Sequence, residues 1–149
     1  MAEHDFTEIK IEDLIPHRGH MVLIDHIVEI EKEYAVTAAF VKESWPLLTA
    51  NGVQPLILVE LAAQSAGVCN GWDRITKKGL HSVSMGWLVG VKKAVFNIEC
   101  IPLHSKIITR SENSNKYDNL RVTSSVSWLG SDIIGEITLQ LFQAPQNEI

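Results

Sequence analysis

The chain is poor in cysteine, in long apolar runs and in positive charge, and each shortage excludes a class of protein. Its two cysteines, Cys69 and Cys100, are too few for a disulfide-rich secreted scaffold and predict free thiols in a reducing cytoplasm. No apolar run approaches the ~18 residues of a membrane-spanning helix, and the polar, acidic residues 1–5 are unlike a signal peptide. The net charge of −5 argues against nucleic acid as the main partner.

Motifs for binding metals and phosphates are also missing. The six histidines include no pair four residues apart on a predicted helix, and no two cysteines stand at ligand spacing. His17 and His20 are three residues apart, but histidines in a loop with proline and glycine more often bind no zinc. There is no glycine-rich phosphate loop and no Gly-x-Ser-x-Gly turn. The sequence therefore predicts neither a metal site nor an organic cofactor.

Composition and periodicity predict one globular domain over residues 1–149, with an α+β fold. The apolar share of 46% and the charged share of 21% are ordinary for such a domain. Proline, leucine and alanine favour one helix from about Pro55 to Asp73. An antiparallel sheet must curl around a single apolar helix to bury it. Strand patterns occur at residues 21–28, 34–41, 83–96, 107–112, 120–128 and 133–142.

One carboxylate lies within the apolar pattern of the helix. Glu60 is the only ionisable residue in the range 56–68, and a carboxylate buried there must be paired, hydrogen-bonded or protonated. Burial raises the pKa of a carboxyl, which suits an acid in catalysis. Helical spacing places Gln64, Gly67 and Gly71 on the same face. Two interpretations stay open: a functional carboxyl with a perturbed pKa, or a structural glutamate that binds nearby backbone.

Three segments match the motifs of one known family, in the family's order. Residues 14–18 are Leu-Ile-Pro-His-Arg, residues 58–67 are Leu-Val-Glu-Leu-Ala-Ala-Gln-Ser-Ala-Gly, and residues 89–96 are Val-Gly-Val-Lys-Lys-Ala-Val-Phe. Together with the strand that begins at residue 21, they resemble three parts of the (3R)-hydroxyacyl-acyl-carrier-protein dehydratases. These parts are the opening Leu-x-Pro-His-Arg motif, the central-helix motif Leu-Glu-x-x-Ala-Gln-x-x-Gly and the third strand. The resemblance covers residues 11–142, nearly the whole chain.

The resemblance implies a hot-dog fold, in which an antiparallel sheet wraps around one central helix. It also implies a homodimer or higher homo-oligomer whose sheets pair edge to edge, with active sites at the subunit interface. The substrate would be an acyl thioester of acyl carrier protein or coenzyme A, held in a tunnel along the helix. Glu60 would be the acid/base carboxyl, and Gln64 would either orient it or satisfy a buried carbonyl. The backbone N–H groups of Leu56 and Ile57 at the helix start are placed to face the thioester oxygen.

The histidine that most of this family uses as a base is missing. It stands in a Gly-His-Phe-Pro-Gly loop before the helix and removes the α-proton, but residues 44–54 contain no histidine. In this respect the chain is similar to a branch associated with aryl-polyene-type biosynthesis, whose members lack that loop and keep the Pro-His-Arg and Glu-x-x-Ala-Gln segments. His17, in the Pro-His-Arg segment, is therefore the expected base. The alternative is a loop histidine that binds backbone.

Three functions stay open from the sequence. The first is dehydration of a 3-hydroxyacyl thioester by Glu60 and His17, with or without isomerisation, in fatty acid or polyene-type biosynthesis. The second is hydrolysis of an acyl thioester, with Glu60 activating water. The third is a non-catalytic module that binds acyl chains or their carrier protein. Five basic residues are candidates either for a surface that binds an acidic carrier protein or for solvated turns: Arg74, Lys77, Lys78, Lys92 and Lys93.

Overall fold

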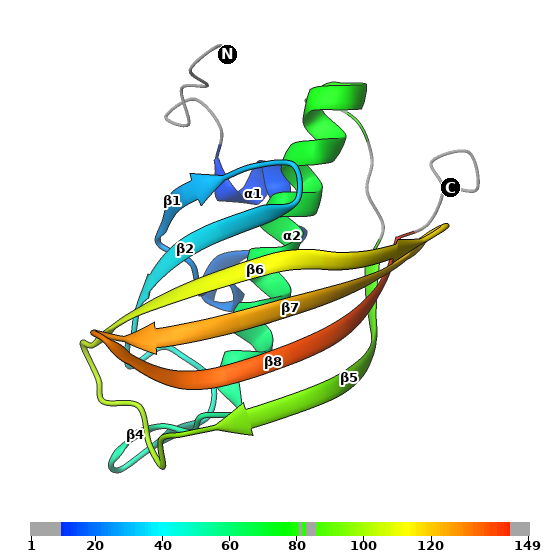
Figure 1. Ribbon diagram of the computed structural model, residues 1–149. Helices are drawn as coiled ribbons and strands as arrows, with labels where there is room; N and C mark the ends of the chain where they lie inside the picture. The colour runs from blue at the N-terminus through cyan, green and yellow to red at the C-terminus, as the bar shows by residue number, and fades with distance from the viewer. Residues whose placement is uncertain (1–9, 81, 83–85, 144–149) are drawn as a thin grey trace.

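Six strands form one curved antiparallel sheet that wraps around a long helix, as predicted (Figure 1). The computed structural model describes residues 10–80, 82 and 86–143. The strand order across the sheet is β1-β2-β6-β7-β8-β5, and two further strands form a small hairpin. The elements are α1 (Ile11–Leu14), the 3-10 helix η2 (Gly19–Met21), β1 (His26–Ile30), β2 (Tyr34–Phe40), β3 (Leu48–Thr49), β4 (Gly52–Val53), α2 (Ile57–Lys78), β5 (Gly86–Phe96), β6 (Lys106–Tyr117), β7 (Leu120–Leu129) and β8 (Asp132–Gln143).

The central helix α2 is longer than its apolar pattern predicts. It continues past Asp73, the predicted end, to Lys78. The extra turn is held by polar contacts, because Lys77 pairs with the Asp73 carboxylate at 3.0 Å and the Thr76 hydroxyl donates to the Asp73 carbonyl at 3.0 Å. Contacts of this kind between residues three or four apart stabilise a helical turn, and Ile75 in the same turn packs against the core. The helix ends before Gly79, whose φ of 91° favours glycine.

Hydroxyl side chains line the sheet where α2 packs against it. Thr109 and Ser127 form a hydrogen bond of 2.8 Å across β6 and β7, and Ser111 and Ser125 form one of 2.5 Å. The Ser111 hydroxyl also lies 3.1 Å from the Ala62 carbonyl oxygen of α2, as its donor. These short side chains let the helix approach the sheet closely, and each hydroxyl has the partner that a buried polar group requires.

The alternation in β7 therefore buries its polar positions. Ser125 and Ser127 are 3% and 1% exposed, whereas Val126 and Trp128 alternate with them and are only half-buried. The covering helix lies on the hydroxyl side. Burial in this strand is thus decided by which face meets α2, and hydrophobicity along the strand does not reveal it.

The first predicted strand is wrong over residues 21–25, because β1 begins only at His26. The Asp25 N–H still donates to the Ala38 carbonyl of β2 at 2.9 Å, whereas the backbone of Met21 and Leu23 is bound by a side chain of α2. The Leu23 N–H donates to Gln64 Oε1 at 3.0 Å, and Gln64 Nε2 donates to the Met21 carbonyl at 2.6 Å. These contacts hold the N-terminal part of the chain against α2.

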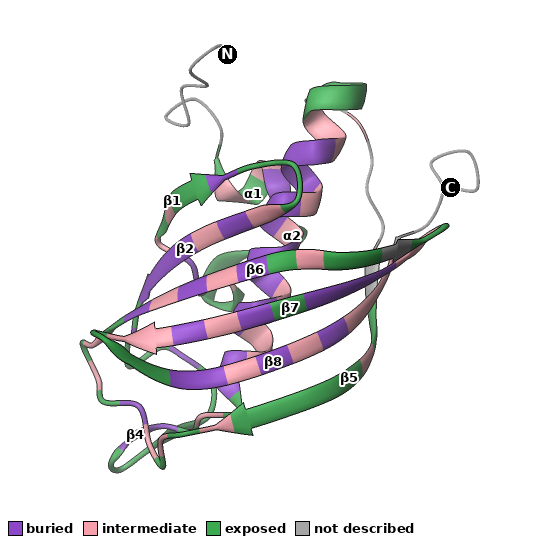
Figure 2. Ribbon diagram, in the orientation of Figure 1, coloured by how far each residue is buried: buried purple, intermediate pink, exposed green. Residues whose placement is uncertain are grey.

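The edge strand β5 exposes apolar side chains. It pairs with β8 on one side, and Figure 2 shows that most of its length is exposed. Its exposed large residues are Leu88, Val89, Val91 and Val95, at 45%, 56%, 47% and 37%. No helix among the described residues is long and apolar enough to cross a membrane.

Candidate active site

His17 and Glu60, the two residues predicted to carry the chemistry, lie in direct contact within one chain. His17 Nε2 is 2.9 Å from Glu60 Oε1. His17 comes from the loop between α1 and η2, and Glu60 from the first turn of α2. The two side chains are 27% and 33% exposed, so the pair is half-buried and one side of it stays open. A histidine and a carboxyl in this arrangement can exchange a proton with each other and with a bound molecule.

The pKa of Glu60 shifts opposite to the sequence expectation. The hydrogen bond from His17 lowers it most; burial raises it, and the hydrogen bond from Gln64 lowers it again, so that the pKa lies below its ordinary value. The expectation of a raised pKa is therefore wrong for the net shift, although burial itself acts in the expected direction. Donors aimed at the charged form outweigh the desolvation of a carboxyl that keeps a third of its surface exposed. Glu60 is a carboxylate at neutral pH in the free protein.

Gln64 fulfils both roles that the sequence left open. Its Nε2 donates to Glu60 Oε1 at 3.0 Å and to the Met21 carbonyl at 2.6 Å, and its Oε1 accepts from the Leu23 N–H. Its side chain is fully buried, and both amide hydrogens are taken. Gln64 therefore holds Glu60 and the N-terminal chain, and its direct contact with a ligand stays a prediction.

The start of α2 offers fewer free donors than expected. The Ile57 N–H donates to the Gln54 carbonyl at 3.1 Å, and the expectation that it faces a thioester oxygen stays a prediction. Leu56 precedes the helix, and 53% of its surface is exposed. The preceding loop, where the family usually carries a histidine, is folded into the β3–β4 hairpin at residues 48–53.

Neither His20 nor the two cysteines contact this pair in the part of the chain that the structure describes. His20 lies exposed in η2, and His4 and His81 are outside the described residues. Within residues 10–80, 82 and 86–143, no three His, Cys, Asp or Glu side chains gather as metal ligands would. Cys69 and Cys100 are free thiols, as predicted. Burial raises the pKa of Cys69 to about 12, which makes that thiol a poor nucleophile.

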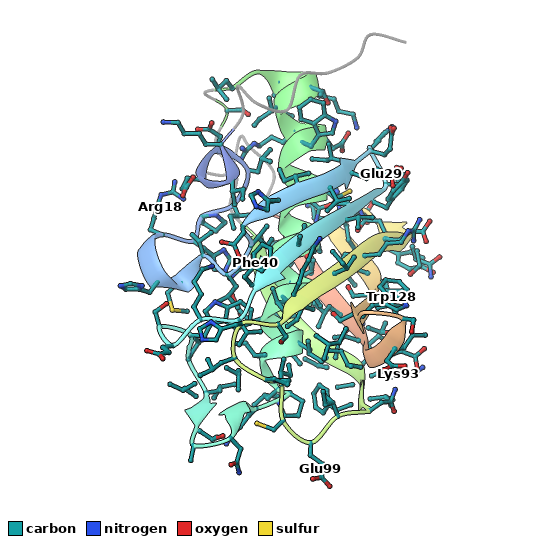
Figure 3. All side chains as sticks on the ribbon, turned by 90° about the vertical axis from the view of Figure 1, so that its left-hand side faces the viewer. Arg18, Glu29, Phe40, Lys93, Glu99 and Trp128 are labelled. Atoms are coloured by element: carbon teal, nitrogen blue, oxygen red, sulfur yellow. The ribbon has the colours of Figure 1, made fainter. Side chains whose placement is uncertain are left out.

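The basic residues considered for a carrier-binding surface belong to separate regions of this chain. Lys77 and Lys78 lie at the C-terminal end of α2, and Lys77 is paired with Asp73. Lys93 belongs to β5 and lies far from that end of the helix in Figure 3. One chain by itself therefore does not join them into a single patch.

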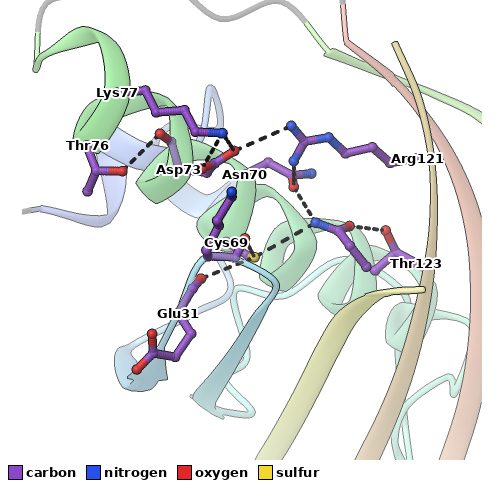
Figure 4. A network of polar contacts seen from close by, with 10 residues as sticks. Glu31, Cys69, Asn70, Asp73, Thr76, Lys77, Arg121 and Thr123 are labelled. Carbon is purple, nitrogen blue, oxygen red and sulfur yellow. Dashed lines mark hydrogen bonds and ion pairs between the residues drawn. The ribbon is translucent and has the colours of Figure 1, made fainter. Parts of the chain in front are cut away.

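A buried polar network at the far end of α2 escaped the sequence analysis (Figure 4). Asn113 Nδ2 donates to Asn70 Oδ1 at 2.9 Å, and the Thr123 hydroxyl donates to Asn113 Oδ1 at 3.0 Å. The Arg121 guanidinium donates to the same Asn70 oxygen and lies 3.7 Å from Asp73 Oδ2. The network ties α2 to β6 and β7. Its only sequence signal is the place of Arg121 among the small hydroxyl positions of β7.

Comparison with known proteins identifies the family of the chain. The model of the ApeP-like family, described as ApeP dehydratase, matches residues 9–148. The 3-hydroxyacyl-[acyl-carrier-protein] dehydratase FabZ of Xylella fastidiosa (strain M12) is 30% identical over 104 residues, which make up 63% of this chain and 62% of the relative. The matched part thus spans less than two thirds of that relative's length.

Solved structures share the fold over nearly the whole chain. The dehydratase heterocomplex ApeI:P from Xenorhabdus doucetiae matches with a TM-score of 0.82 and 18% identity, over 93% of both chains. Cj0977, a sigma28-regulated virulence protein from Campylobacter jejuni, matches with a TM-score of 0.69 and 15% identity, over 96% of this chain and 92% of the other. At these identities the likeness concerns the fold alone. The match of the family model shows that the chain belongs to the ApeP-like dehydratase family, which confirms the predicted place in the aryl-polyene branch of the hot-dog dehydratases.

Proposed function

We propose that this protein dehydrates a 3-hydroxyacyl thioester of acyl carrier protein or coenzyme A, with His17 as the base and Glu60 as the acid. The observation that carries the proposal is the 2.9 Å contact between His17 Nε2 and Glu60 Oε1. A histidine thus lies beside the helix carboxyl, although in this chain the loop that carries the family's usual histidine has none. Membership in the ApeP-like dehydratase family supports the same reaction.

The reaction needs two proton transfers and no cofactor. His17 takes the proton from C2 of the acyl chain, the C3–O bond breaks as the C2–C3 double bond forms, and Glu60 gives a proton to the departing hydroxyl as water leaves. One proton enters the pair and one leaves it, so the pair ends with as many protons as it began with. For His17 to accept a proton while Glu60 gives one, the pair must share one titratable proton, which Glu60 carries in the reactive form.

The lowered pKa of Glu60 makes it a carboxylate before substrate binds. A bound acyl chain excludes water from the pair, and desolvation favours the neutral forms of both groups. In that form the shared proton lies on Glu60, which makes Glu60 the acid and His17 the base.

We further propose that the active unit is a homodimer formed through β5, with the acyl chain held between α2 and this strand. An exposed edge strand with apolar side chains needs a partner, and Leu88 and Val91 are 45% and 47% exposed.

Val91→Lys is expected to give monomers at micromolar concentration, whereas the wild type is expected to sediment as a dimer. The exposed Glu99→Gln serves as the control. A wild-type monomer contradicts the proposal, and a mixed assembly with a related chain is the other outcome to look for.

Product analysis tests the reaction. With a 3-hydroxyacyl thioester as substrate, we expect an enoyl thioester with its thioester bond intact, detected by mass spectrometry and ultraviolet absorbance. Release of a free thiol would instead assign hydrolysis, with Glu60 activating water. Binding of the thioester without turnover would assign a non-catalytic module.

We also propose that the protein acts in the reducing cytoplasm, which the free thiols of Cys69 and Cys100 support.

A further inference from the structure

The face of α2 that carries Glu60 binds the N-terminal part of the chain along most of its length. Five helix positions three or four residues apart each contact a residue of segment 13–23. Toward the C-terminal end of the helix, Arg74 binds the Asp13 carbonyl, Gly71 meets Leu14 and Gly67 meets Ile15. Nearer the start of the helix, Gln64 binds Met21 and Leu23, and Glu60 meets His17. Residues 13–17 thus run antiparallel to the helix, which places His17 in contact with Glu60.

The two glycines set how closely this segment approaches. A Cβ at Gly71 would lie 2.2 Å from the Leu14 carbonyl oxygen and 2.9 Å from the Leu14 Cα, so the backbone of the segment would have to move. A Cβ at Gly67 would lie 3.0 Å from Ile15 Cγ2, the end of a side chain. Gly71 therefore fixes the backbone of the segment more strictly than Gly67 does.

His17 has no second anchor of its own. Its Nδ1 atom is buried and has no hydrogen-bond partner among the described residues. The neighbouring Arg18 instead binds backbone, because its guanidinium donates to the carbonyls of Ile15 and His17 at 2.8 and 2.7 Å. Among the described residues, the ring is therefore positioned by its contact with Glu60 and by the backbone that carries it. A second hydrogen bond, which often orients a functional histidine, is not made by a described residue.

From these contacts we propose that Gly71 and Arg74 are positioning residues, which set the His17–Glu60 contact from three and four turns away by fixing segment 13–17 on α2. Gly71 lies about 16 Å from Glu60 along the helix axis, too far to touch the substrate carbon that reacts at the pair. The inference rests on the proposed function for its kinetic consequence, whereas the contact itself can be tested without substrate. A shift of the histidine by about 1 Å suffices to lower a rate 10²-fold.

The test uses two variants, Gly71→Ala and Arg74→Gln. We expect kcat to fall about 10- to 100-fold with KM little changed, the stronger effect coming from Gly71→Ala. Without substrate, the Glu60 carboxyl should titrate at higher pH in both variants when followed by carbon-13 NMR, because the His17 hydrogen bond that lowers its pKa is weakened. Arg74→Gln adds no atoms at a close contact and keeps the test valid should Gly71→Ala fold poorly.

Two control variants separate positioning from a general loss of stability. Gly135→Ala places a Cβ 2.7 Å from Leu58 Cδ1 in the core, away from segment 13–17, and Lys78→Gln changes an exposed residue at the end of α2. Both should keep the wild-type Glu60 titration and kcat at temperatures where they are folded. An unchanged Glu60 titration in folded Gly71→Ala and Arg74→Gln overturns the inference. Should the wild type lack dehydratase activity, the proposed function fails and the titration still decides the positioning.

Discussion

Replacing Glu60 with glutamine is expected to lower the dehydration rate by about 10²- to 10⁴-fold, the usual contribution of one acid or base. The amide has nearly the size of the carboxyl and its oxygen still accepts from His17 and Gln64, which both contact Glu60 Oε1. Folding should therefore survive, while the group that protonates the leaving hydroxyl is lost. The measurement is the rate of enoyl thioester formation, together with circular dichroism and the melting temperature.

The exposed Glu99 offers a matched control for this substitution. Glu99→Gln removes the same charge from the loop after β5, far from the pair along the chain, and should keep the full rate. A folded Glu60→Gln protein that retains wild-type activity would contradict both the dehydratase and the thioesterase mechanisms. The role of Glu60 would then be limited to holding His17 and Gln64.

Replacing His17 with alanine is expected to lower the rate by a similar factor and to raise the pKa of Glu60. The His17 hydrogen bond is the largest cause of the lowered pKa, and without it the opposing effect of burial gains weight. A carboxyl with a lowered folded-state pKa contributes stability above its unfolded pKa, near 4.3, which is lost as the pH falls through the folded value. His17→Ala should therefore lose less stability on the acid side than the wild type, in denaturant titrations at several pH values.

The two variants together also assign the base. In deuterated water, Glu60→Gln should still exchange the C2 proton of a 3-hydroxyacyl thioester, because His17 remains, whereas His17→Ala should not. The opposite pattern would make Glu60 the base and His17 the acid. His20→Ala, which changes an exposed histidine in η2, should exchange and dehydrate like the wild type.

The sequence by itself determined the architecture and the two residues at the centre of the site. The composition of the segment from about Pro55 to Asp73 predicts a buried helix, since periodicity and propensity are local properties that a single chain displays. The isolation of Glu60 within it marks a carboxyl that needs partners. The Pro-His-Arg segment around His17 points to the family, and the missing loop histidine leaves His17 as the expected base.

Only the tertiary structure decided how these parts act on one another. It placed His17 on Glu60 and thereby reversed the expected pKa shift, because donors from distant segments outweigh burial. It bound residues 21–23 to Gln64, which prevents a strand there, and it turned the hydroxyl side of β7 toward α2. Each of these outcomes depends on contacts between segments far apart in the chain. The local sequence pattern does not show which face of β7 such contacts bury. It also does not show whether burial or the donated hydrogen bonds decide the pKa of Glu60.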